Sequence, residues 1–197
     1  HTLLPLGNKN KAWIRETAER QGFCNARKHD SQDICFVPDR DYAKFMEQYT
    51  GKRYPAGDFL DTEGNVIGRH RGAVRYTVGQ RKGLGLAMGT PVYVCGKDME
   101  KNTVSVGPES ALFSQSVTVG EMNWIAIPEL TAPMRVCAKL RYRQVEQPAL
   151  ATPLADGRIR LDFDEPQRAP AVGQAAVLYD GDVVVGGGTI VGTGGEG

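Results

Sequence analysis

The chain has 197 residues, 41% of them hydrophobic, and a formal net charge of +1, which suits one large or two modest domains and excludes nucleic-acid binding through bulk positive charge. Four scattered cysteines without a C-x-x-C pair argue against a zinc knuckle or a disulfide framework and favour a reducing, cytoplasmic setting. No apolar run approaches the ~20 residues that span a bilayer, and no leader pattern opens the chain, so we expect no membrane partner.

A first helix is predicted over residues 9–21. Asn8 is a good N-cap, Gly22 is a good C-terminal stop, and no proline lies between them. The apolar face of this helix is thin, which indicates a peripheral position.

The next feature is the stretch 30–37, which reads as a short strand with the thiol of Cys35 near its entry. Arg27, Lys28 and His29 lie immediately upstream and could lower the pKa of a nearby thiol, making a thiolate available near neutrality. A free cysteine between two apolar residues is by default a small buried hydrophobe, so a reactive and a packing role both remain open.

A second helix is predicted between Asp39, as its cap, and Gly51. Four large side chains recur in it at i, i+3, i+4 and i+7, which favours a face packed in a core: Tyr42, Phe45, Met46 and Tyr49. Turn clusters then flank short strands expected at 59–60 and 66–67, and a hairpin is predicted from 92–95 and 103–106.

The segment 69–82 carries a basic patch without an acid: Arg69, Arg71, Arg75, Arg81 and Lys82. It runs into the glycine-rich stretch 79–85, where Arg81 and Lys82 could meet phosphate. A surface loop with solvated charges is the competing interpretation, and the spacing of a Walker loop is absent.

The strongest alternation runs from Met134 to Arg143 and predicts a strand with one apolar face. Its other face is a row of mostly cationic side chains, ~6 to 7 Å apart, near the phosphate repeat of a nucleic acid: Arg135, Lys139, Arg141 and Arg143. An edge strand kept soluble by its charges is the alternative.

Tight turns at 155–158 and 180–181 predict two further hairpins, 149–154 with 159–163 and 175–179 with 183–185. Regularly spaced antiparallel strands over some eighty residues favour a small closed barrel. Gly186, Gly187 and Gly188 fit a bulge or barrel corner, because no helix pattern follows them.

These elements, taken together, resemble the carboxy-terminal part of the tRNA-specific 2-thiouridylases, which replace an oxygen by sulfur on the wobble uridine of certain tRNAs. The resemblance rests on six motifs that follow in the family's order over nearly the whole chain, at residues 4–7, 30–36, 61–68, 77–85, 141–144 and 170–177. It implies that Cys35 carries sulfur as a persulfide, received from a sulfur-relay protein or a cysteine desulfurase.

The resemblance also implies that Arg141, Tyr142 and Gln174 contact tRNA, and we add Arg81, Lys82 and Arg143 as further candidates. Our alternation places Tyr142 on the apolar face, so either a bulge or the strand end turns it outward, or it supports its neighbour. ATP with magnesium belongs to the full-length enzyme. The ATP-binding loop and the second catalytic cysteine lie upstream of this chain, which we therefore expect to bind no cofactor and to be inactive alone.

The expected fold is α+β and mostly β. It comprises the tail of an α/β ATP-binding domain (1–35), a small central α+β domain (36–110), and an antiparallel β-barrel resembling the second domain of elongation factors (111–197). Two rival functions remain open. One is a noncatalytic RNA-binding or translation-factor-like barrel module with a buried Cys35, and the other is a cysteine hydrolase using Cys35 with His29 or His70.

Overall fold

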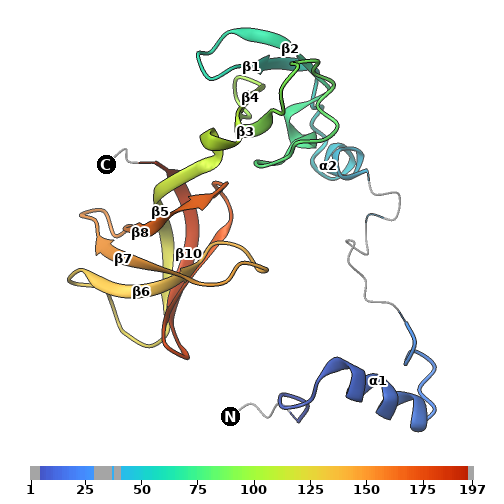
Figure 1. The fold of residues 1–197 in the computed structure, drawn as a ribbon, viewed down its shortest axis with the longest axis vertical. Coiled ribbons are helices and arrows are strands. Elements are labelled where there is room, and N and C mark those ends of the chain that lie inside the picture. Colours follow the sequence, from blue (N-terminus) through green and yellow to red (C-terminus); the bar gives the residue numbers. More distant parts are fainter. Residues whose placement is uncertain (1–4, 29–36, 38–40, 195–197) are drawn as a thin grey trace. The chain divides into compact units, whose positions relative to one another are not determined.

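The computed structural model describes residues 5–28, 37 and 41–194 (Figure 1). The chain divides into two compact units, His1–Thr50 and Gly51–Gly197. Cys35, His29 and Asp39 lie outside the described residues. Within the described ranges, no helix combines the length and the apolar character needed to cross a membrane.

The first unit contains helix α1, Lys11–Arg20, which starts two residues later than the sequence predicts. Asn10 is the N-cap, in place of Asn8, because its side chain accepts a hydrogen bond from the Trp13 backbone N–H at 2.9 Å. Gly22 follows the helix with a φ of 72°, as expected of a stop residue. None of the helix residues is buried, which agrees with a thin apolar face.

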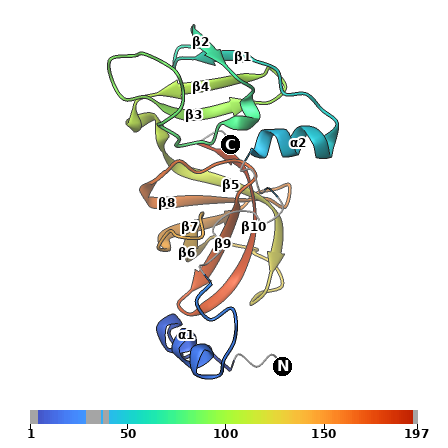
Figure 2. The same ribbon diagram turned by 90° about the vertical axis from the view of Figure 1, so that its right-hand side faces the viewer.

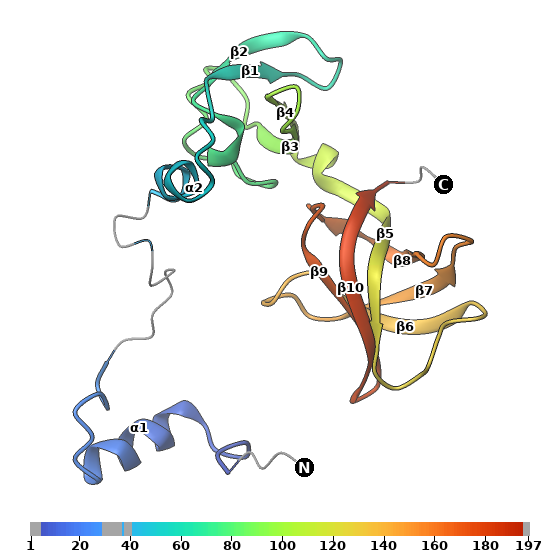
Figure 3. The ribbon, with the colours of Figure 1, turned by 180° about the vertical axis from the view of Figure 1, so that it is seen from behind.

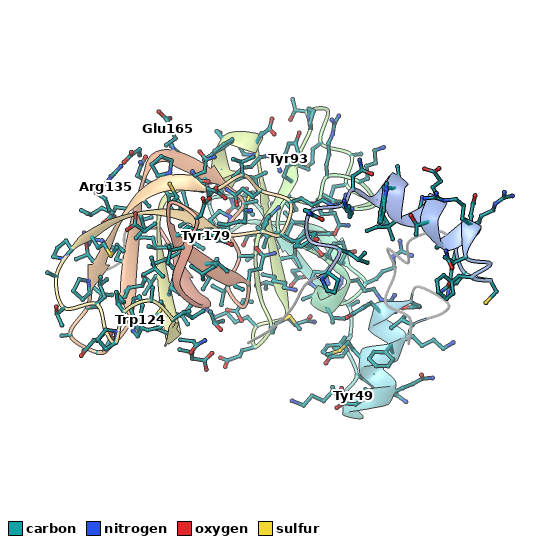
Figure 4. The ribbon with its side chains drawn as sticks, turned by 90° about the horizontal axis from the view of Figure 1, so that it is seen from below. Tyr49, Tyr93, Trp124, Arg135, Glu165 and Tyr179 are labelled. Atoms are coloured by element: carbon teal, nitrogen blue, oxygen red, sulfur yellow. The ribbon has the colours of Figure 1, made fainter. Side chains whose placement is uncertain are left out.

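Helix α2, Tyr42–Thr50, also lies in the first unit, and Asp41 Oδ1 accepts from the Lys44 N–H at 3.0 Å near its start. The prediction that its aromatic stripe packs in a core is wrong. Tyr49, labelled in Figure 4, is 79% exposed and Tyr42 is 46% exposed. The ring of Phe45 stacks on that of Tyr49 with centroids 5.8 Å apart. The aromatic side chains of α2 thus pack largely on one another.

The second unit begins with a four-stranded sheet, hereafter the small sheet, ordered β2-β1-β4-β3 (Figure 2). Its strands are β1 Gly57–Leu60, β2 Val66–His70, β3 Tyr93–Asp98 and β4 Thr103–Gly107. The β3–β4 pair is antiparallel, which confirms the predicted hairpin. The two strands expected at 59–60 and 66–67 are also present and pair antiparallel as β1 and β2, and β1 runs parallel to β4. The sheet buries Phe59, Val94 and Val104 completely, with Tyr76 packed edge-on against Phe59.

Polar side chains fix the connections of the small sheet. In the β1–β2 turn, Asp61 accepts hydrogen bonds from the Glu63 and Asn65 N–H groups at 2.8 and 2.9 Å and from the Asn65 side chain at 3.0 Å. These donors, the Asn65 side chain first, hold the pKa of the Asp61 carboxyl below its ordinary value. Short 3₁₀ turns at Ala73–Arg75 and Glu109–Leu112 complete this part of the chain.

Six strands close into a barrel in the order β10-β5-β8-β7-β6-β9, which confirms the predicted barrel. They are β5 Phe113–Trp124, β6 Met134–Lys139, β7 Gln147–Pro153, β8 Ile159–Arg168, β9 Ala175–Asp180 and β10 Val183–Thr193. The long strands β5 and β10 run side by side (Figure 3). Since β6 pairs with both β7 and β9, the alternative that it is an edge strand is wrong.

The glycines of β10 allow the barrel to close tightly. Register shifts occur on both sides of Gly187, as a bulge or corner requires. A Cβ at Gly188 would lie 2.4 Å from the Gly120 carbonyl oxygen, and one at Gly186 would lie 2.7 Å from that of Asn123. The prediction of a bulge or barrel corner here agrees with the structure.

Ala169 joins the barrel to the small sheet in an unusual conformation. It is almost fully buried and has a φ of 53°, in the left-handed region that disfavours residues other than glycine. Its N–H donates to the Leu112 carbonyl at 2.6 Å. The neighbouring Arg168 guanidinium contacts Glu109 at 3.2 Å and lies over the ring of Tyr93, so the junction is held by several contacts.

Candidate functional site

A surface groove on the barrel, hereafter the barrel groove, has a volume of about 690 Å³. Its lining comes from the end of β6, the turn that follows, the start of β9, and Thr77, which precedes the glycine-rich stretch 79–85. The lining residues are Thr77, Lys139, Leu140, Arg141, Tyr142, Arg143, Gln174, Ala175, Val177 and Tyr179. Four candidate residues named from the sequence, at 141, 142, 143 and 174, therefore meet in one place.

The turn after β6 orients Tyr142. The strand ends at Lys139 instead of continuing to Arg143 as predicted, and the Gln144 N–H closes a turn on the Arg141 carbonyl at 3.1 Å. Tyr142 is 96% exposed as a result. Of the alternatives left open by the sequence, the strand end is the one that turns this side chain outward.

Arg141 points inward from the same turn. Its Nη2 donates to the backbone carbonyl of Ala169, and its Nε is buried without a hydrogen-bond partner in the part of the chain that the structure describes. Gln174, which begins the approach to β9, has a buried side-chain oxygen that likewise lacks a partner there. Two residues that line the barrel groove thus each carry one buried polar atom without a hydrogen-bond partner among the described residues.

The cationic row predicted along β6 is largely neutralised by acids. Arg135 forms two hydrogen bonds with Asp164, at 2.8 and 2.5 Å, and this pairing holds the pKa of the Asp164 carboxyl below its ordinary value. Lys139 Nζ lies 3.5 Å from Glu146 and 5.8 Å from the centroid of the Tyr179 ring. The strand β6 therefore does not present a continuous row of unpaired cationic side chains at the spacing of nucleic-acid phosphates.

The basic loop, residues 79–85, lies in the small-sheet part of the second unit. Gln80 organises it, because its Oε1 accepts from the Thr77 N–H and its Nε2 donates to the Lys82 carbonyl, both at 3.0 Å. Arg81 and Lys82 are exposed and do not line the barrel groove. Beside the loop is a second cavity of about 460 Å³, lined by Arg71, Arg75, Tyr76, Gln80 and Gly83.

Three cysteines lie in the described residues, and all three are free thiols. Cys24 is exposed, whereas burial raises the pKa of the Cys95 thiol, which donates to the Tyr93 carbonyl at 3.4 Å. His70 is buried, and both of its ring nitrogens are engaged, Nδ1 by the Gly72 N–H at 3.0 Å and Nε2 with the Asn102 carbonyl at 3.1 Å. Its imidazole is thus committed to the structure.

The sequence reasoning missed Ala169 and the groove wall formed by Thr77 and Tyr179. No sequence signal marks Ala169, because a left-handed alanine cannot be told from any other alanine. Thr77 lies close to the basic loop in sequence, but its approach to the barrel depends on the packing of the whole unit.

Three family models match consecutive parts of the chain. Residues 1–39 match a tRNA methyl transferase HUP domain, residues 43–108 a tRNA methyl transferase PRC-barrel domain, and residues 114–190 an aminomethyltransferase beta-barrel domain. The fold and the matches define a class of multidomain protein whose first two domains are named after enzymes that modify tRNA.

Similar full-length proteins make the assignment more particular. The tRNA-specific 2-thiouridylase MnmA of Acetivibrio thermocellus is 52% identical over 190 residues, which are 96% of this chain and 53% of that protein. That of Heliobacterium modesticaldum is 51% identical over 192 residues, or 96% and 50% of the two chains. The chain belongs to the tRNA-specific 2-thiouridylase family. It spans about half the length of the curated relatives it matches.

Proposed function

We propose that this chain supplies the sulfur-carrying and tRNA-binding parts of an enzyme that 2-thiolates the wobble uridine of tRNA. The observation that carries the proposal is the meeting of Arg141, Tyr142 and Gln174 in one groove, within a chain that aligns over 96% of its length with proteins named for this activity. The groove offers an arginine, an exposed aromatic ring and an amide, which are the side chains that RNA-binding proteins use for unpaired nucleotides.

The sulfur step is proposed for Cys35. A uridine carbonyl oxygen is a poor leaving group, so it must first be activated as an adenylate. The terminal sulfur of a Cys35 persulfide then attacks the uridine carbon, and AMP leaves with the oxygen. A thiolate of a second cysteine attacks the Cys35 sulfur, which releases the thiolated base and leaves a disulfide between the two cysteines. A sulfur-relay protein or a cysteine desulfurase would load Cys35.

ATP and magnesium are assigned to the portion of the relatives that this chain does not cover. The described residues contain no group of three or more His, Cys, Asp or Glu side chains that could hold a metal ion. The basic loop also lacks the spacing of a Walker loop. We propose that the adenylation step belongs to that portion, and that this chain alone does not thiolate tRNA.

The rival candidates differ in what they require. A noncatalytic RNA-binding module needs only the barrel groove and an inert Cys35. A cysteine hydrolase that pairs Cys35 with His70 is disfavoured, because both nitrogens of that imidazole are already hydrogen-bonded. The free thiols of the described cysteines fit the reducing, cytoplasmic setting that we propose for the protein.

The deciding experiment is peptide mass spectrometry of the chain after exposure to a persulfide-loaded sulfurtransferase. We expect one added sulfur atom on the peptide that contains Cys35. The adduct should disappear in Cys35→Ser and persist in Cys24→Ser, a matched control because Cys24 is an exposed free thiol. Labelling of Cys24 in preference to Cys35, or no adduct from a donor that loads another acceptor, would overturn the sulfur-carrier role.

A further inference from the structure

The turn between β6 and β7, residues 140–146, is joined to the end of β8 by side chains. The register of β7 with β8 ends at the pair Ala149 and Phe163, although β8 continues to Arg168. Beyond that pair, hydrogen bonds from the turn take the place of the ladder. The position of the turn therefore depends on which side chains make those bonds.

Two glutamine side chains, hereafter the amide relay, connect the turn to β8. Gln144 Oε1 accepts from the Leu140 N–H at 3.2 Å, and Gln144 Nε2 donates to Gln167 Oε1 at 2.6 Å. Gln167 Nε2 then donates to the Glu165 carbonyl at 2.7 Å. Gln167 is only 5% exposed, so water cannot readily replace these bonds.

The backbone groups at the two ends of the amide relay fix the orientation of both side chains. A backbone N–H only donates and a backbone carbonyl only accepts, so each glutamine must turn its oxygen toward Leu140 and its nitrogen toward Glu165. A carboxylate has no donor, and an aliphatic side chain has neither group. Both positions therefore require an amide for the relay to be complete.

The amide relay holds the turn that exposes Tyr142. The side chain of Gln144 bonds Leu140 and its main-chain N–H bonds the Arg141 carbonyl at 3.1 Å, so one residue fixes the backbone just before Tyr142. A second link to the same region runs from Arg141 Nη2 to the carbonyl of Ala169, directly after β8. The ring of Tyr142 is 96% exposed, so its direction depends on this backbone and not on packing.

We propose that Gln144 and Gln167 are positioning residues for tRNA binding, which hold the turn so that the ring of Tyr142 points toward the nucleic acid. Neither glutamine touches the tRNA; both act through the backbone of the turn. This role rests on the proposed binding of tRNA and adds what sets Tyr142 in place. A turn that is already ordered avoids the entropy cost of ordering it on binding.

The first test is a double-mutant cycle, read by anisotropy with a fluorescent, unmodified tRNA transcript. Gln144→Leu breaks the amide relay and should weaken binding about fivefold, the effect of one net hydrogen bond. In a Tyr142→Ala background the same substitution should change the affinity by less than about twofold, because the ring that it misdirects is absent. The thermal midpoint should fall equally in both backgrounds, since Tyr142 is exposed.

Gln167→Met gives a second, independent test, and it serves if Gln144→Leu does not fold. Methionine has a similar length but no amide, so the relay is broken at its far end. Among the described residues, Gln167 is bonded to the Gln144 side chain and to Glu165, not to the backbone of the turn. Hydrogen exchange of residues 140–146, measured by mass spectrometry, should nevertheless become faster, because Gln144 loses its support.

Gln115→Leu is the matched control. Its Nε2 also donates to a carbonyl of β8, that of Phe163, but the residue lies on β5 and outside the amide relay. The variant should keep the tRNA affinity of the unchanged chain and the exchange rates of residues 140–146. An effect as large as that of Gln144→Leu would show that any lost bond to β8 suffices, which would overturn the specific role of the relay.

The remaining outcomes separate the positioning role from tRNA binding itself. An equal loss of affinity from Gln144→Leu in the two backgrounds, or no loss in either, would show that the amide relay does not act through Tyr142. Unchanged exchange in Gln167→Met would show that the relay does not hold the turn. Each of these results would overturn the positioning role and leave tRNA binding in place. If the unchanged chain does not bind the transcript, the proposed tRNA binding is overturned, and the positioning role with it.

Discussion

The basic loop and the barrel groove both combine arginine with tight turns, but their polar groups are used differently. In the basic loop, the side-chain oxygen and nitrogen of Gln80 are both hydrogen-bonded to neighbouring backbone groups, and the side chains of Arg81 and Lys82 are exposed to solvent. In the barrel groove, Arg141 Nε and Gln174 Oε1 are buried and unpartnered among the described residues. The two regions therefore differ in whether their polar side chains are hydrogen-bonded, a difference that the density of charge in the sequence does not reveal.

The same contrast holds within the barrel itself. Arg135 and Arg141 stand six residues apart, on β6 and just beyond its end, and the sequence pattern treats them alike. Arg135 is exposed and paired with Asp164 through two hydrogen bonds, whereas Arg141 reaches inward and retains an unused donor. Pairing and burial, which depend on residues distant in the sequence, separate a structural arginine from a candidate ligand-binding one.

The largest effect should come from breaking the barrel frame. In Gly188→Ala the new Cβ would stand 2.4 Å from the Gly120 carbonyl oxygen, so we expect a loss of ~1–3 kcal/mol in the free energy of unfolding. Urea denaturation measures it. Gly96→Ala in β3 of the small sheet is the control, because nothing lies within 4 Å of its Cβ. Equal losses in the two variants would contradict the tight packing assigned to β10.

Arg141→Ala removes a guanidinium that lines the barrel groove and should weaken binding of an unmodified tRNA transcript by ~1–3 kcal/mol, the usual cost of a charge-assisted contact. The dependence of the affinity on salt should become shallower as well. Anisotropy at several salt concentrations measures both quantities. An unchanged affinity and slope would remove Arg141 from the interface.

Arg81→Ala sharpens the comparison from the side of the basic loop. Its side chain is exposed, and we expect binding of the same tRNA transcript to weaken by less than ~1 kcal/mol, with a slightly shallower salt dependence. The same titrations measure it beside Arg141→Ala. If Arg81→Ala proves the more damaging substitution, the basic loop, and not the barrel groove, is the main contact.

Asp61→Asn should have the smallest effect and a defined pH dependence. The folded state lowers the pKa of the Asp61 carboxyl, so its ionised form stabilises the fold above the ordinary value of 3.8, and this contribution is lost as the pH falls through the lower, folded pKa. The variant should be less stable near neutrality, with the gap closing in acid. Urea midpoints from pH 7 to pH 3 test this, with Asp182→Asn as the control, and a constant gap would contradict it.

Local signals in the sequence predict the hairpins well. The β7–β8 turn is specified by Asp156 and Gly157, since Asp156 Oδ1 accepts from the Arg158 N–H at 3.1 Å and Gly157 has a φ of 80°. Strand alternation and turn spacing then predict the barrel. The cap of α1 is predicted at Asn8 and lies at Asn10, because an asparagine at either position satisfies the same local rule.

Long-range pairing decides what local patterns leave open. Alternation continues to Arg143, but β6 stops at Lys139, where its pairing with β9 ends, and the Gln144 side chain then takes the Leu140 N–H. Three residues of the barrel groove, Arg141, Tyr142 and Gln174, could be named from a family resemblance. The closed barrel brings these residues together, buries Arg141 Nε and places the Ala169 carbonyl where it accepts from Arg141. No single segment of the sequence encodes that closure.

The place of β10 in the barrel has a consequence for synthesis on the ribosome. This strand joins β5, the first barrel strand, to β9, so the ring cannot close until the residues of β10 have been translated. A chain interrupted before Val183 would leave the edges of β5 and β9 unpaired, and such edges template intermolecular association. Premature termination should thus yield an aggregation-prone product that quality-control proteases can recognise, instead of a partly active one.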